Sequence, residues 1–391
     1  MQREKLWTKD FTMVSIVNYL LTLTFYLLIV IIGSHAVQTY DASLSEVGLV
    51  TGLFVVGTLL GRLFTGRAID RVGRKKTLIV GLVLFTLATL LYFIQVGIVF
   101  LIFTRFVHGM MLGIASTGAG TIVAQVLPPT RRAEGIGYYS TGATLATAIG
   151  PFVGMFMMKV ASSTMIFALC LMVGIVALLL ASFLQVPLLE MKKEMPKSGW
   201  KFSSFVEVNA VPISMITLII ATGYAGLLSF FNLYAAEADL GQAASVFFVV
   251  YALAILFSRP FMGPLIDAKG ANIVMYPTFV LYGGGMILLG LAQNSMMLLT
   301  AAVIIGLGFG NMQSSIQAIA IQVTPPQRIG LATSTFYIFM DAGLGFGPYV
   351  LGFIVGATGY RGLYLLAGTV IILAAFLYYF LHGKKEQLTK S

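Results

Sequence analysis

Long apolar runs restrict the fold of this chain more than any other feature of its sequence. Hydrophobic residues make up 58% of its 391 residues and charged residues only 10%, whereas ordinary globular chains carry about 25% charged residues. Each run is roughly 20 residues long, the length of a helix that crosses a bilayer. The runs do not alternate with a period of two, so they predict helices and not barrel strands. We therefore expect an all-α polytopic membrane protein.

Twelve spans are predicted, and the connections between them sort by charge. Most of the 24 basic residues fall on the side that holds both termini. By the positive-inside rule both termini are cytoplasmic, which requires an even number of spans. The net charge of +10 is therefore a topology signal in a multi-pass protein of the cell membrane, with anionic membrane lipids as expected contacts. We expect no nucleic-acid partner. The spans lie at about 11–33, 45–65, 77–96, 98–124, 135–157, 163–186, 208–234, 243–266, 272–292, 296–323, 330–355 and 362–382.

The chain repeats itself at an offset of 197 residues. Residues 187–205 form a long polar stretch near the middle, so we expect two pseudo-symmetric six-helix bundles, at 1–186 and 206–391, joined by a cytoplasmic linker at 187–205. Two parallel halves favour a transporter that binds its substrate near the midplane and opens to each side in turn. The matching pairs include charged residues, glycines and prolines, which chance would not align in one register: Arg62/Arg259, Gly66/Gly263, Asp70/Asp267, Gly73/Gly270, Gly109/Gly306, Pro128/Pro325 and Gly150-Pro151/Gly347-Pro348.

The stretch Gly61–Leu78, GRLFTGRAIDRVGRKKTL, is a charged turn between the second and third spans. Gly66 allows two helices to approach closely. Asp70 lies within reach of the basic residues that follow it, so an ion pair there can lock one conformation. The alternative is that the basic cluster only sets the topology. The residues of this motif are Gly66, Asp70, Arg71, Gly73, Arg74 and Lys75.

This motif resembles the signature loop between the second and third helices of the major facilitator superfamily. The resemblance covers essentially the whole chain, including its length, its two halves, its central loop and a degraded second copy of the motif at 258–275. It implies the major facilitator fold, a gating role for the loop and transport without enzymatic catalysis. The sequence contains no phosphate-binding loop, metal-ligand cluster or nucleophile triad, so we expect no cofactor and no metal.

Two residues of the fourth span are candidates for proton coupling. A charged residue inside the bilayer usually faces a cavity or a partner, and Arg105 is followed by Gly109 and Gly113 in a spacing similar to the family's fourth-helix motif, which is associated with proton transfer. The second half has Ala302 where Arg105 would repeat. His108 lies one turn away and histidine can titrate near neutral pH, although a packing or hydrogen-bonding role is the alternative.

Asp341 is an acidic residue that we place well within a span, and its counterpart in the first half is Thr144. An intramembrane carboxylate is a candidate for reversible protonation or for binding a cationic substrate. The alternatives are a permanent ion pair with an arginine or a polar residue at a helix kink. We expect Asp341, Arg105 and His108 to couple transport to protons.

Gly142, Gly150, Pro151 and Gly154 lie in the fifth span, within GATLATAIGPFVGM. They resemble the fifth-helix signature of the exporter branch of the superfamily, the antiporters, although Met155 stands where the family often has a second glycine. A Gly-Pro pair bends a helix, and small residues allow close helix contact. The alternative is a packing kink that implies no direction of transport.

The resemblance implies a substrate cavity lined by the first, fourth, seventh and tenth spans. We expect a monomeric, proton-coupled exporter of a small organic compound, similar to bacterial drug and sugar efflux permeases. The alternatives are a proton symporter that imports a nutrient or chelate, a lipid or glycolipid flippase, and a non-transporting membrane sensor. Aromatic and amide side chains suit an amphipathic or mildly cationic molecule, and the cavity candidates are Asn18, Tyr26, Tyr139, Phe230, Tyr234, Asn311 and Tyr337.

Overall fold

The computed structural model describes residues 4–186, 205–384 and 386, and the regular elements within these ranges are helices. Among them, eleven continuous stretches are long and apolar enough to cross a membrane. One stretch, Pro326–Gly383, is 58 residues long and is interrupted at Gly359, where φ is 69° and ψ is 179°. These angles are not helical, so one helix ends and a new span begins at this residue. Residues other than glycine rarely adopt such a positive φ. The prediction of an all-α protein with twelve spans is confirmed.

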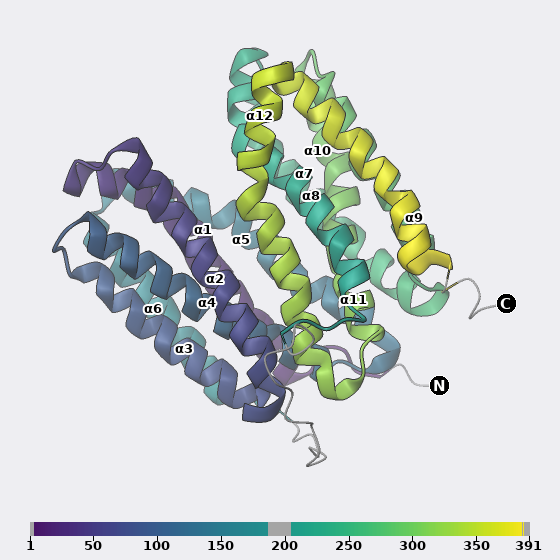
Figure 1. Ribbon diagram of the computed structural model, residues 1–391, viewed down its shortest axis with the longest axis horizontal. Coiled ribbons are helices and arrows are strands. Elements are labelled where there is room, and N and C mark those ends of the chain that lie inside the picture. Colours follow the sequence, from purple (N-terminus) through teal and green to yellow (C-terminus); the bar gives the residue numbers. More distant parts are fainter. Residues whose placement is uncertain (1–3, 187–204, 385, 387–391) are drawn as a thin grey trace. The chain divides into compact units, whose positions relative to one another are not determined.

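The N-terminal unit is drawn mostly in purple to blue in Figure 1. It comprises the described residues within Met1–Pro128, Gly142–Glu207 and Thr324–Ile338. The first turns of α12 (Ile329–Tyr378) therefore belong to it, although they come from the second half of the sequence. Its other helices are α1 (Lys9–Tyr40), α2 (Leu44–Val72), α3 (Arg74–Leu90), α4 (Ile98–Val126), most of α5 (Arg132–Val160) and α6 (Ser163–Ser182).

The C-terminal unit comprises the described residues within Pro129–Thr141, Val208–Val323 and Phe339–Ser391. It includes the first turns of α5. Each unit therefore contains one short segment from the other half of the sequence. The predicted division at 186 and 206 does not include these exchanged segments. The predicted linker, apart from Phe205, lies outside the described residues. The other helices of this unit are α7 (Val211–Glu237), α8 (Gly241–Lys269), α9 (Asn272–Gly290), α10 (Ser295–Ile305), α11 (Asn311–Gln322) and the remainder of α12.

The tenth span is not a regular α-helix. A π-helical turn, Gly306–Gly310, joins α10 to α11, and the three pieces together cross the membrane as one apolar stretch, Ser295–Gln322. Such π-turns insert an extra residue into a helix and are frequent at functional sites.

Glycines set the closest helix contacts in both units. A Cβ at Gly61 of α2 would meet the backbone of α4, and a Cβ at Gly109 or Gly113 of α4 would meet the backbone of α2. Of their repeat counterparts, Gly306 faces the Tyr251 carbonyl of α8, and Gly310 faces the Ile255 side chain of the same helix. Small residues allow membrane helices to pack backbone against backbone, so the repeated glycines place the fourth and tenth spans within their units.

Polar side chains fix the starts of several helices. The hydroxyl of Thr8 accepts a hydrogen bond from the N–H of Phe11 at 3.2 Å at the start of α1. Ser43 and Glu46 form a reciprocal capping box at the start of α2. These side chains satisfy N–H groups that have no partner within the helix.

Candidate functional site

The predicted charged turn lies where α2 ends and α3 begins. Gly73 is both the C-cap of α2 and the N-cap of α3, and its φ of 101° lies in the region that favours glycine. Asp70 and Arg71 occupy the last turn of α2, and Arg74 begins α3. The side chain of Arg71 is exposed, whereas those of Asp70 and Arg74 are not.

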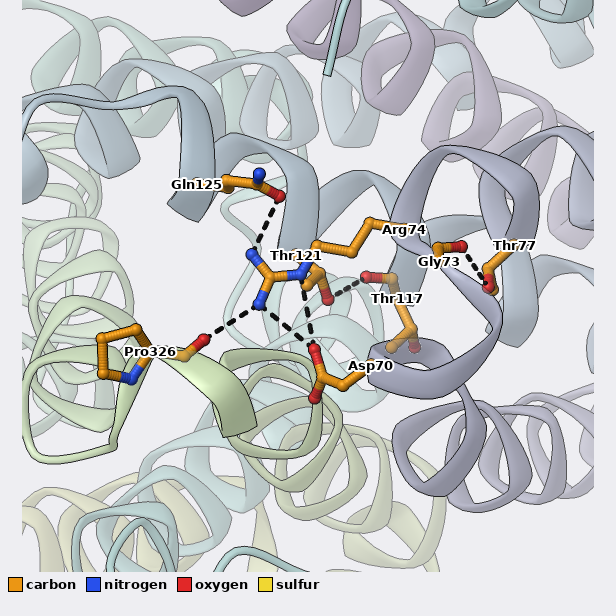
Figure 2. Close-up of polar contacts among 8 residues, drawn as sticks. All are labelled: Asp70, Gly73, Arg74, Thr77, Thr117, Thr121, Gln125 and Pro326. Carbon is orange, nitrogen blue, oxygen red and sulfur yellow. Dashed lines mark hydrogen bonds and ion pairs between the residues drawn. The ribbon is translucent and has the colours of Figure 1, made fainter. Parts of the chain in front are cut away.

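Asp70 and Arg74 form an ion pair that is shielded from solvent. Their side chains are 9% and 5% exposed, and Nη2 of Arg74 lies 3.1 Å from Oδ1 of Asp70. The same guanidinium donates to Oε1 of Gln125 at 2.9 Å and to the carbonyl of Pro326 at 3.1 Å (Figure 2). Arg74 therefore joins the α2–α3 turn to α4 and to the residues that precede α12.

Asp70 also caps the start of α12. The backbone N–H groups of Gly330 and Leu331 donate to its carboxylate, and α12 begins at Ile329. The first N–H groups of a helix lack partners within the helix and carry partial positive charge. A Cβ at Gly330 would press on the side chains of Ile69 and Asp70, so this helix start can approach the carboxylate only because position 330 is a glycine.

Asp267, the repeat counterpart of Asp70, makes the corresponding contacts in the C-terminal unit. Its two oxygens accept hydrogen bonds from the backbone N–H groups of Ala133 and Glu134, each at 2.9 Å, at the start of α5. These two residues lie 197 positions before Gly330 and Leu331. The repeat therefore extends from residue types to hydrogen bonds.

Lys75 supports the same end of the N-terminal unit. Its ammonium donates to the carbonyls of Ser182 and Leu184, at 3.0 and 2.6 Å, where α6 ends. Asn272, its repeat counterpart, donates to the carbonyl of Gly383 at 2.9 Å, where the last helix ends. The two residues differ in charge but connect equivalent helices.

Arg62 and Gly66 of α2 both contact the first turns of α12. The guanidinium of Arg62 lies 4.3 Å from the centre of the Tyr337 ring. The hydroxyl of Ser334 donates to the Arg62 carbonyl at 2.6 Å, and a Cβ at Gly66 would overlap the Ser334 side chain. Tyr337, one of the expected cavity residues, is therefore a stacking partner of Arg62.

Arg259 lies among polar groups of the tenth span. It is 3% exposed, and its guanidinium donates to the carbonyl of Gly310 at 3.0 Å and to the hydroxyl of Ser314. Asn311, another expected cavity residue, donates to the hydroxyl of Ser258 and to the carbonyl of Leu307, both at 2.8 Å. The π-helical turn thus lies within a hydrogen-bonded network inside the C-terminal unit.

Arg105 and His108 are buried in the N-terminal unit and are connected through Tyr92. The guanidinium of Arg105 donates to the Val50 carbonyl at 3.1 Å and to the Tyr92 hydroxyl at 3.2 Å. It also lies 4.1 Å from the centre of the Phe54 ring. Nδ1 of His108 lies 3.1 Å from the same Tyr92 hydroxyl. The two predicted residues are therefore brought into one hydrogen-bonded chain.

The fifth-span glycines all face α1. A Cβ at Gly142 would lie 3.3 Å from Tyr19, a Cβ at Gly150 would lie 2.7 Å from Tyr26, and a Cβ at Gly154 would lie 3.0 Å from the Leu27 carbonyl. Pro151 lies inside α5, next to this contact. The predicted motif therefore forms a continuous small-residue face against one helix.

Asp341 lies on α12 within the C-terminal unit and is 9% exposed. Its neighbour Met340 accepts a hydrogen bond from Gln313 at 3.1 Å, and a Cβ at Gly343 would lie 2.8 Å from the Leu218 carbonyl of α7. This stretch of α12 is therefore packed against α7 and α11.

The other expected cavity residues differ in their surroundings. The hydroxyl of Tyr234 donates to the Leu289 carbonyl at 2.7 Å. Asn18 and Tyr139 are 6% and 1% exposed, and Phe230 is half-buried beside Tyr360. Their role in substrate binding stays a prediction.

Several participants were not singled out from the sequence. Gln125 is the repeat counterpart of Gln322, but nothing in the sequence connects it to Arg74. Pro326 acts through its carbonyl and Ser334 through its hydroxyl, which any similar residue could offer. Tyr92 lies near the end of the third predicted span, and its position gives no indication that it contacts both Arg105 and His108. Within the described ranges, no group of three histidine, cysteine or acidic side chains is placed to hold a metal ion.

A family model described as Major Facilitator Superfamily matches the chain over residues 14–250 and again over 213–391. An uncharacterized MFS-type transporter of Methanocaldococcus jannaschii is 25% identical, over 88% of this chain and 90% of that protein. The staphylopine export protein of Staphylococcus aureus is 24% identical, over 90% of this chain and 92% of its own length. The quinolone resistance protein NorA of the same species is 24% identical, with coverage of 84% and 87%.

Two solved structures share the fold. The human organic anion transporter MFSD10 superimposes with a TM-score of 0.75 at 16% identity, covering 94% of this chain and 98% of that one. The fucose:proton symporter FucP of E. coli superimposes with a TM-score of 0.73 at 14% identity, with the same coverage.

We expect Asp70→Asn to destabilise the protein more than Asp267→Asn. Asparagine is itself a good helix cap, so both variants keep an acceptor at the helix start. Asp70→Asn also leaves Arg74 buried without its carboxylate, an effect of about 3 kcal/mol, whereas Asp267→Asn loses mainly a charge–dipole interaction of about 1 kcal/mol. Melting temperatures of the purified variants in detergent measure the difference, and equal shifts would contradict it.

Proposed function

The chain belongs to the Major Facilitator Superfamily, whose members are transport proteins and not enzymes, and we propose that it exports a small organic compound in exchange for protons. The observation that carries this proposal is the contact between α5 and α1. Gly142, Gly150 and Gly154 form a small-residue face beside Pro151, and all three face α1. This is the arrangement that an antiporter-like fifth helix needs to form a tight seal.

The names of two relatives support export. One is called an export protein and the other a resistance protein. Staphylopine and quinolones are both small organic molecules, and the aromatic and amide candidates in this chain suit a molecule of that class. The preferred substrate is amphipathic or weakly cationic, because aromatic faces attract both apolar groups and cations.

The two capped helix starts supply the gate. Transport by alternating access requires contacts that break in one state and re-form in the other. Asp70 holds the first turn of α12, and Asp267 holds the first turn of α5. Each interaction is polar and local, so it can be released without disturbing the apolar packing of the spans.

Proton coupling is assigned to Asp341, with Arg105 and His108 as supporting groups. Protonation of Asp341 from the outside weakens the binding of a cationic substrate and releases it. Loss of the proton to the cytoplasm restores the carboxylate and its affinity. Tyr92 connects Arg105 to His108, so a change in the protonation of His108 affects the hydrogen bonds of Arg105, which stays charged.

The protein is an integral membrane protein, because its spans cross the bilayer and its relatives are membrane transporters. We place it in the plasma membrane as a monomer with both termini in the cytoplasm. The α2–α3 turn, which is rich in arginine and lysine, then faces the anionic cytoplasmic leaflet.

This orientation predicts the behaviour of reporters fused to the C-terminus. A fluorescent protein that matures only in the cytoplasm should be bright, and alkaline phosphatase, which needs export for activity, should be inactive. A dark fluorescent fusion together with an active phosphatase fusion would contradict the assignment of the termini.

Replacing Asp341 with asparagine should reduce the rate of proton-driven transport tenfold or more. A tenfold reduction corresponds to about 1.4 kcal/mol. Asp239→Asn is the matched control, because Asp239 is exposed and its φ of 56° suits asparagine equally well. The assay uses proteoliposomes with an imposed pH gradient. The compound comes from a growth screen of a deletion strain, beginning with ethidium and a fluoroquinolone.

The same vesicles separate the other candidates. Protons that move opposite to the compound support antiport, and protons that move with it indicate a symporter. Movement of labelled lipid without either indicates a flippase. Proton-driven transport that survives Asp341→Asn would show that coupling lies elsewhere.

A further inference from the structure

Glu207 is a buried carboxylate outside the gate motif, the antiporter-like motif and the proton-coupling residues. It stands shortly before α7, next to the central linker, and its side chain is 2% exposed. Its Oε2 lies 2.7 Å from Nε of Arg328, whose side chain is 35% exposed. A carboxylate this well shielded is found almost only where a partner compensates the loss of water.

Arg328 belongs to the short turn Pro326–Arg328 that leads into α12. Pro326 of this turn accepts the hydrogen bond from Arg74, and Gly330 and Leu331, which follow it, donate to Asp70. The ion pair with Glu207 therefore holds the residues that the gate carboxylate recognises.

A second contact from Glu207 acts one turn further along α12. Its backbone N–H donates to the hydroxyl of Thr335 at 2.9 Å, and this hydroxyl donates to the Leu331 carbonyl at 2.7 Å. Phe205, two residues earlier, lies under the guanidinium of Arg67 on α2, 4.7 Å from it. The first turns of α12 are thus contacted by Asp70 and by Glu207.

The internal repeat explains why a distant acid is needed here. In the first half, Arg131 pairs with Glu134, with nitrogen–oxygen distances of 2.8 and 2.7 Å, at the start of α5. Arg328 is the counterpart of Arg131, but the counterpart of Glu134 is Leu331. The start of α12 therefore has a leucine where the start of α5 has an acid, and Glu207 supplies the carboxylate that pairs with Arg328.

We propose that Glu207 is a positioning residue for the gate: through Arg328 and Thr335 it holds the start of α12 where Asp70 can cap it. Its consequence for transport rests on the proposed function above. The positioning itself is tested without transport, so the two can fail separately.

The test is hydrogen exchange of the purified full-length protein, read for the backbone amides of residues 329–332. Glu207→Gln and Arg328→Gln should each speed exchange there by about tenfold, within the coupling range of contacting residues. The double variant should exchange no faster than either single variant, because both remove the same pair. Arg328→Lys keeps the charge and should stay within about threefold of the original protein.

Glu237→Gln is the matched control, because Glu237 is exposed near the other end of α7. It should leave residues 329–332 unchanged. Unchanged exchange in Arg328→Gln, whose side chain is partly exposed, would overturn the proposal even if Glu207→Gln failed to fold. Additive effects in the double variant would overturn it as well, since Glu207 would then not act through Arg328.

Discussion

The capping of a helix start by a carboxylate that is partly or largely shielded from water is the interaction on which the rest of this structure depends. Taking a carboxylate out of water is unfavourable unless hydrogen bonds and opposite charge compensate it. Asp70 and Asp267 obtain that compensation from helix starts that belong to the opposite half of the sequence. The exchange of segments between the two units follows from these contacts. A helix start held in this way can be released as a unit, which is what a gate requires.

The two halves have kept their packing and changed their charges. Glycines at equivalent positions of the fourth and tenth spans pack against equivalent residues of α2 and α8. Several charged side chains, in contrast, occur in one half only. Positions that carry charge in one half alone include Arg74 (Ala271 in the other half), Arg105 (Ala302), Glu134 (Leu331) and Asp341 (Thr144).

Most of the architecture could be predicted because it depends on composition and spacing. Apolar runs of bilayer length predict spans, and the repeated glycines, prolines and aspartates predict two equivalent halves. The motif around Asp70 predicts an ion pair with the basic residues that follow it, and the partner is Arg74. What could not be predicted depends on contacts between distant segments. Gly330 and Leu331 act through their backbone N–H groups, which every sequence offers, so no residue type indicates them.

Local irregularities were also hidden in the sequence. The π-helical turn in the tenth span leaves no pattern that distinguishes its glycines from the packing glycines of the fourth span. Glu207 stands beside a polar linker in the sequence, and only the structure shows that it lies 2.7 Å from Arg328. The role of Tyr92 could not be predicted either. An aromatic residue near the end of a span usually lies at the lipid interface, whereas Tyr92 joins Arg105 to His108.

The most direct measurement is the distance between spin labels on the two halves. Val72 and Ile273 are exposed, at 49% and 42%, near the α2–α3 and α8–α9 turns, and the single native cysteine, Cys170, is buried. Cysteines introduced at these two positions can therefore be labelled selectively. If Asp70 holds the start of α12, Asp70→Asn should add a population of longer distances to the distribution of the original protein. A distribution that does not change would contradict the central role of this cap.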